Sequence, residues 1–152
     1  MKRLIVLVLS LVLVMGLVVY INTLPKRQSL SNGDSYSDVE GVFVEVEGIN
    51  IYPDIISLVV LWNNMTEYGV TYGNSYSIER LENGEWVDCS LKDNIFTLIG
   101  YDLKANERVN KEYRLTDMYD VSKPGTYRFL SSCYLDMGYN KECNVWVEFI
   151  VK

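Results

Sequence analysis

The residue types that perform most enzymatic chemistry are absent from this sequence or scattered along it. There is no histidine among the 152 residues, which excludes Ser-His and Cys-His nucleophile pairs and histidine-based metal sites. The three cysteines, Cys89, Cys133 and Cys143, lack the C-x-x-C spacing of a zinc site, and no glycine-rich phosphate loop is present. We therefore expect no enzymatic activity, no catalytic residue, no metal and no cofactor.

Carboxylates are plentiful, and several of them cluster in one early stretch. They are Asp34, Asp38, Glu40, Glu45 and Glu47. A calcium loop of the EF-hand type would need glycine where Val39 stands, so a solvated acidic surface is the favoured interpretation. A hydrolase built on two carboxylates is the least favoured alternative, because nothing in the spacing selects one pair.

Two of the cysteines have a spacing that suits a hairpin. If the hairpin is centred on Gly138, Cys133 falls opposite Cys143, and the same register turns the rings of Tyr127 and Phe129 to one face. The other cross-strand pairs are Tyr127 with Phe149 and Phe129 with Val147. The sequence therefore predicts either a disulfide between Cys133 and Cys143, as an extracytoplasmic domain would allow, or two buried thiols that stay reduced.

Several aromatic residues fall in predicted turns or on outward faces and are candidates for contact with a partner. They are Tyr68, Tyr72, Tyr134, Tyr139 and Trp146. Tyrosine and tryptophan at the rim of an interface often contact partners, but on a small sandwich they also cover the sheet. These residues therefore either contact a partner or cover the sheet.

Composition and charge define the class of domain. Twelve Tyr, four Phe and three Trp accompany many Val and Ile, while Ala105 is the only alanine, which favours strands over helices. Four basic residues supply all the charge before Asp34, and the rest of the chain carries a net charge of −10. Such an acidic domain is a poor binder of nucleic acid, because phosphate contacts need clustered Lys and Arg.

The N-terminal part has a charge pattern of its own. Lys2 and Arg3 precede eighteen uncharged residues, Leu4 to Ile21, which as a helix would measure about 27 Å, close to a bilayer core. The alternatives are a cleaved signal peptide and a retained signal-anchor, and the anchor is favoured because no small-residue cleavage site follows. We expect a single pass through the cell membrane at residues 4–21, with the domain on the extracytoplasmic side. Secretion after cleavage is the alternative.

From Gly41 onward, short apolar stretches alternate with turn signals. Residues 1–24 are assigned to the anchor or signal peptide, residues 25–40 to a flexible linker and residues 41–152 to one domain. The predicted strands are 42–47, 55–62, 75–81, 85–89, 95–100, 109–115, 126–134 and 143–151. Their even spacing predicts an all-β antiparallel sandwich, preceded by one N-terminal transmembrane or signal helix.

Particular residues resemble a known family. They are Trp62-Asn63-Asn64 at the end of an apolar strand, the hairpin over 76–86, and the pair 103–107 and 123–128. Together they resemble the bacterial immunoglobulin-like domain of secreted and membrane-tethered Gram-positive proteins. Gly125-x-Tyr127-x-Phe129 is similar to the tyrosine-corner strand of immunoglobulin folds, with Phe129 where those carry a cysteine. The resemblance implies an immunoglobulin-like β-sandwich in a cell-surface setting, and it implies no catalytic residues.

Two functions remain open. The first is a non-catalytic, membrane-tethered module that binds a protein or glycan at the cell surface. The second is a regulatory or inhibitory ectodomain that acts on a membrane or cell-wall enzyme. The apolar segment has only Ser10 and Tyr20 as polar residues, which favours tethering over signalling.

Overall fold

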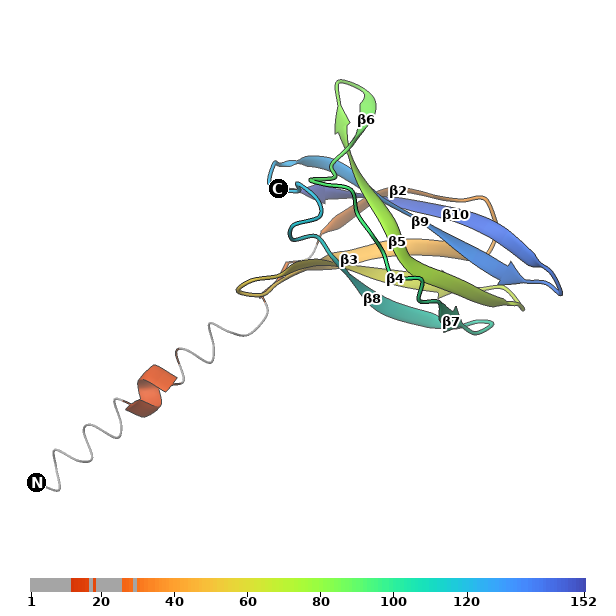
Figure 1. Ribbon diagram of the computed structural model, residues 1–152, viewed down its shortest axis with the longest axis horizontal. Helices are drawn as coiled ribbons and strands as arrows, with labels where there is room; N and C mark the ends of the chain where they lie inside the picture. Colours follow the sequence, from red (N-terminus) through yellow and green to blue (C-terminus); the bar gives the residue numbers. More distant parts are fainter. Residues whose placement is uncertain (1–11, 17, 19–25, 29) are drawn as a thin grey trace, which may run out of the picture.

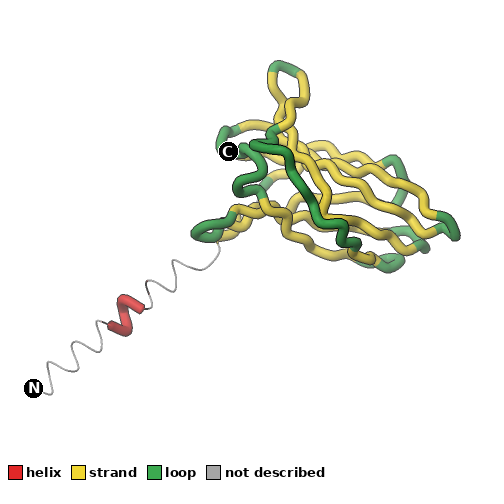
Figure 2. The backbone as a smooth tube through the Cα atoms, in the orientation of Figure 1, coloured by secondary structure: helices red, strands yellow, loops and turns green. Residues whose placement is uncertain are grey.

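The computed structural model describes residues 12–16, 18, 26–28 and 30–152 (Figure 2). Residues 12–16 and 18 are helical. Most of the predicted anchor, residues 4–21, lies outside these described ranges. Within them, no helix has both the length and the apolar character needed to cross a bilayer.

The described strands form two antiparallel sheets that pack face to face (Figure 1). In chain order they are β1 (Lys26–Gln28), β2 (Ser31–Ser37), β3 (Val42–Ile51), β4 (Ile56–Asn64), β5 (Gly69–Glu82), β6 (Glu85–Asp88), β7 (Tyr101–Leu103), β8 (Arg108–Arg114), β9 (Gly125–Asp136) and β10 (Asn140–Val151). The four-stranded sheet has the order β1-β3-β4-β8. The six-stranded sheet has the order β2-β10-β9-β5-β6, and β7 pairs with β5.

The core lies between the two sheets because alternate residues of the strands are apolar and point inward. Tyr127 and Phe129 of β9 are fully buried, and Trp62 of β4 is buried across from them. Nε1 of Trp62 donates a hydrogen bond of 2.8 Å to the hydroxyl of Tyr113 in β8. A buried ring of this kind stabilises the fold by about 1.5–3 kcal/mol, and the hydrogen bond avoids the cost of burying a bare N–H group.

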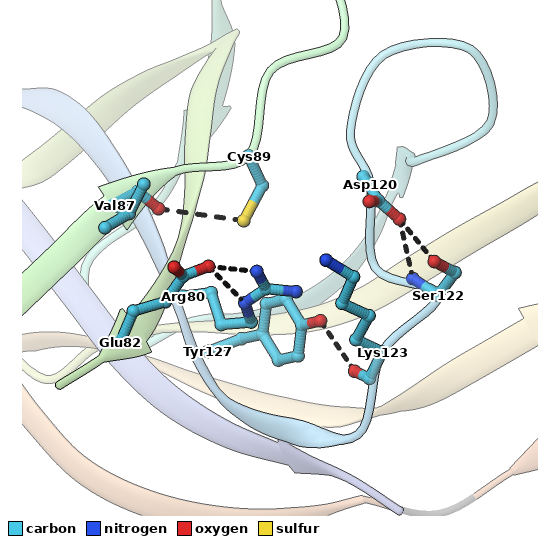
Figure 3. A network of polar contacts seen from close by, with 8 residues as sticks. All are labelled: Arg80, Glu82, Val87, Cys89, Asp120, Ser122, Lys123 and Tyr127. Carbon is cyan, nitrogen blue, oxygen red and sulfur yellow. Dashed lines mark hydrogen bonds and ion pairs between the residues drawn. The ribbon is translucent and has the colours of Figure 1, made fainter.

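The strand that the sequence likens to a tyrosine corner has that geometry. The hydroxyl of Tyr127 donates a hydrogen bond of 2.6 Å to the carbonyl oxygen of Lys123, four residues upstream (Figure 3). Beside this ring, Arg80 pairs with Glu82 on β5, and Nε of Arg80 lies 2.9 Å from the carboxylate. The hydrogen bond from Tyr127 to Lys123 ties the segment before β9 to the buried ring, so the loop and the strand are positioned together.

The two predicted hairpins are confirmed. Asn83 and Gly84 both have positive φ angles and join β5 to β6, as an Asn-Gly turn requires. In the last hairpin, Cys143 lies opposite Cys133 and Val147 lies opposite Phe129. The register follows from the apolar residues of both strands, since a slip by one residue would turn all of them to solvent.

Two segments differ from the sequence prediction. The predicted linker, 25–40, contains β1 and β2, and β2 pairs with β10 over most of its length. Polar residues suit β2 because main-chain bonds hold it at the edge of the sheet, while Oδ1 of Asn32 also accepts from the N–H of Val46 at 3.0 Å. The predicted strand 95–100 is irregular, and the short strand β7 follows it instead.

Candidate functional site

The outer face of the six-stranded sheet carries a groove over β5, β9 and β10, with a volume of about 410 Å³. The side chains that could reach a ligand there are those of Ser75, Ser77, Ser132, Asn144 and Trp146. Among the described residues that line the groove, none is charged. That is unusual for a domain whose net charge is −10, so the groove differs in character from the surface around it.

A break in the ladder between β5 and β9 forms the groove. Tyr72 pairs with Cys133 and Tyr76 pairs with Ser131, so three residues of β5 stand opposite Ser132 alone. Such a bulge bends its strand and interrupts the pairing. The hydroxyl of Ser131 donates to the carbonyl oxygen of Ser75 at 2.8 Å, which fixes the bulged strand against β9.

Polar groups in the groove are available to a ligand. Within the part of the chain that the structure describes, the hydroxyls of Ser75, Ser77 and Ser132 make no hydrogen bond to protein. Asn144 is held in place, because its N–H and its side-chain amide both donate to the carboxylate of Asp38, at 2.9 and 3.2 Å. The groove therefore offers three serine hydroxyls and one asparagine side chain that Asp38 holds in place.

Trp146 supplies a flat apolar surface at one side of the groove. Its ring stacks on Tyr36 of β2, with centroids 5.9 Å apart and an angle of 18° between the planes. The guanidinium of Arg128 lies 5.9 Å from the centroid of Trp146 and 4.5 Å from that of Trp86, and it forms an ion pair with Glu79. These contacts restrict the orientation of the indole before any ligand arrives.

The structure separates the aromatic residues that the sequence groups together. Trp146 lies at the groove, while Tyr68 lines a different hollow of about 760 Å³ made by the turns at one end of the sandwich. Tyr139 lies in the β9–β10 turn and is 64% exposed. Tyr134 borders a third hollow, beside residues 96–100.

The prediction of Tyr72 as a contact residue is wrong. Its side chain is only 5% exposed and stacks on Trp62, with ring centroids 4.4 Å apart. Burial raises the pKa of the Tyr72 hydroxyl above its ordinary value. Even-numbered residues of β5 face the core on both sides of the bulge, so Tyr72 points inward with Val70, Tyr76 and Ile78. The sequence prediction begins this strand only at residue 75 and therefore leaves Tyr72 outside the alternation.

The three cysteine thiols differ in acidity. Cys133 and Cys143 lie opposite each other as buried free thiols. The hydrogen bond that Cys133 donates to Cys143, together with burial, raises the pKa of Cys133, and the same bond lowers the pKa of Cys143. Burial also raises the pKa of Cys89, whose sulfur lies 3.7 Å from the carbonyl oxygen of Val87 (Figure 3). A disulfide between Cys133 and Cys143 stays a prediction, which thiol counting under denaturing, non-reducing conditions would test.

In the described residues, no three side chains of the types His, Cys, Asp or Glu come together as a potential metal site.

The two packed antiparallel sheets and the tyrosine corner define an immunoglobulin-like domain. A family model described as a bacterial Ig-like domain matches residues 39–149. Because this match covers most of the sequence, the chain belongs to the bacterial Ig-like domain family. No curated protein matches the chain.

Proposed function

We propose that this protein is a non-catalytic binding module that holds a neutral glycan in the groove beside Trp146. One observation carries the proposal: an uncharged groove with unpaired hydroxyls and a fixed tryptophan lies on an acidic domain. A sugar ring has an apolar face of C–H groups and a rim of hydroxyls. The first suits an indole surface, and the second suits the serines and the amide of Asn144.

Charge favours a neutral ligand over other glycans. An anionic polymer would approach a domain of net charge −10 and find no cation among the described lining residues of the groove. A cationic ligand would lose its hydration there without gaining a charged partner. A neutral glycan loses only hydroxyl hydration, which the groove replaces with hydrogen bonds.

The setting outside the cell is part of the proposal. The uncharged segment 4–21, preceded by Lys2 and Arg3, supports a single-pass anchor in the cell membrane. A tether of this kind would hold the domain where extracellular or cell-wall glycans occur. The absence of histidine from the sequence supports a role without catalysis.

The test is direct binding by the full-length chain in lipid nanodiscs. Neutral oligosaccharides of glucose, xylose, mannose and galactose would be titrated and binding followed by calorimetry and tryptophan fluorescence. Trp146→Ala should weaken binding at least about 30-fold, as expected for a central aromatic contact. Tyr139→Ala is the matched control, because Tyr139 is an exposed aromatic residue outside the groove, and it should bind like the unchanged protein.

Two results would contradict the proposal. One is the absence of binding across the whole neutral panel. The other is binding of a protein or a charged polymer that Trp146→Ala leaves unchanged.

A further inference from the structure

The connection between β6 and β7 contains an unusual stretch, residues 92–100, which we call the linking segment. It runs alongside β5 at the open side of the sandwich (Figure 1). Its central residues, Ile95 to Ile99, are rich in the types that favour strands, yet it is not part of either sheet. In the described chain, it makes no backbone–backbone hydrogen bond, so its main-chain groups are open to pairing.

Contacts with the domain hold the linking segment in place on its inner side. Phe96 packs against Tyr76 with ring centroids 5.1 Å apart, and Thr97 accepts a hydrogen bond of 2.8 Å from the side chain of Asn74. Outside, Ile95 is 94% exposed and Leu98 is completely exposed. Large aliphatic side chains beside unpaired main chain are the features by which an open edge recruits another strand.

We propose that the linking segments of two copies of this chain pair antiparallel about a two-fold axis through Thr97. The sequence around Thr97 is nearly palindromic, Ile-Phe-Thr-Leu-Ile, so Ile95 of one copy lies opposite Ile99 of the other. Phe96 likewise lies opposite Leu98. A two-fold interface must be complementary to itself, and this segment satisfies that condition.

Charge complementarity selects the same register. With the axis at Thr97, Lys92 of one copy lies opposite Asp102 of the other, and symmetry forms this pair twice. Asp102 is in β7. Among the described strands, β7 pairs with β5 alone, so its other edge has no strand beside it. The carboxylate of Asp102 accepts a hydrogen bond of 3.0 Å from Thr71 at one oxygen, and the acid is thereby held at the surface.

Two registers with the axis nearer Leu98 are less favourable. Moving the axis by half a residue toward Leu98 sets Asp93 opposite Asp102, and moving it to Leu98 sets Lys92 opposite Lys104. Like charges directly opposite each other destabilise a strand pair. An anionic lipid surface is a poorer occupant, because the domain carries a net charge of −10.

The experiment measures self-association of the full-length chain in detergent micelles by density-matched sedimentation equilibrium. Lys92→Asp and Asp102→Lys should each weaken dimerisation about tenfold, because each sets like charges opposite each other. The double variant should return the dimerisation constant to that of the unchanged protein. Lys141→Asp is the matched control, since it makes the same charge change in another part of the surface and should leave dimerisation unchanged.

A second measurement does not depend on charge. Thr97 lies on the proposed axis, so Thr97→Cys should form an intermolecular disulfide on mild oxidation, whereas Tyr139→Cys should not. A protein that stays monomeric at about 100 μM would overturn the proposal and leave the edge to another protein or to lipid. Dimerisation that neither Lys92→Asp nor Asp102→Lys weakens would also overturn it. Glycan binding through Trp146 is independent of either result.

Discussion

The outer faces of the two sheets use polar residues in opposite ways. On the four-stranded sheet, Glu112 accepts hydrogen bonds from Asn50 at 2.6 Å, from Ser57 at 2.8 Å and from Tyr52 at 3.4 Å. On the six-stranded sheet, the serine hydroxyls of the groove have no such partner among the described residues. The first face pairs these polar groups internally, and the second leaves the serine hydroxyls of the groove to solvent or a ligand.

This difference follows from the strand pairing. The ladder between β4 and β8 is regular, so side chains meet across it in pairs and satisfy one another. The ladder between β5 and β9 has a bulge, so Ser132 has no single residue opposite it. Binding capacity on a sheet is therefore expected where the pairing is interrupted.

Alkaline pH should disrupt both faces at once, because buried tyrosines support both sheets. Burial raises the pKa of Tyr119 to about 12 and raises those of Tyr72, Tyr76 and Tyr113. Unfolded tyrosine ionises near pH 10, so the folded state binds more protons above that value, and stability should fall as pH rises from about 10 toward 12. Tyrosine absorbance at 295 nm should rise together with the loss of circular dichroism. Full ionisation within an intact sheet would contradict this.

Removing the bulge should give the β5–β9 ladder the regular pairing that the β4–β8 ladder has. Deleting Gly73 and Asn74 leaves Ser75 opposite Ser132 and keeps the alternation of side chains along β5. Glycan binding should fall at least about 30-fold because the groove closes. Circular dichroism would verify that the sheet persists, and a folded variant that binds normally would separate the bulge from the function.

Glu112→Ala should disrupt the hydrogen bonds on the outer face of the four-stranded sheet and leave the groove on the six-stranded sheet intact. Ser57 is 3% exposed, so losing its acceptor leaves a buried hydroxyl unpaired and should cost about 1–3 kcal/mol of unfolding free energy. Urea denaturation would measure the loss, and Glu112→Gln, which keeps one acceptor oxygen, should lose less. Glycan affinity should stay unchanged, since Glu112 lies on the other sheet.

Ser132→Ala should have the smallest effect of these variants. In contrast to Glu112→Ala, it should lower glycan affinity and leave stability nearly unchanged. Stability should change by less than about 0.5 kcal/mol, since the hydroxyl has no described partner in the protein. Affinity for a neutral glycan should fall about fivefold through the lost hydrogen bond. A large change in stability with unchanged binding would assign the serine to the fold instead.

The sequence predicts those elements in which the alternation of apolar residues and the position of turn residues indicate the same strand. The register of the last hairpin follows from Tyr127, Phe129 and their partners, and the Asn83-Gly84 turn follows from its residues alone. Strand β2 escapes prediction because its polar sequence depends on main-chain bonds to β10, more than 100 residues away.

The groove also escapes prediction, for a different reason. Its position depends on where the long-range ladder between β5 and β9 slips, and no local residue pattern marks that point. Ser75 and Ser77 share a face by the alternation of β5, but only the long-range strand pairing shows that Ser132 of β9 lies beside them.

The pairing of β2 with β10 also constrains when the domain can fold. Ser31 meets Ile150 in this ladder, so the six-stranded sheet cannot be completed until β10 has been synthesised. Contacts so distant in sequence make folding slow, and β9 waits unpaired on one side until its neighbour arrives. Until then the chain carries apolar strands that have no neighbour to cover them. A protective chaperone would therefore be most useful before the final strand emerges.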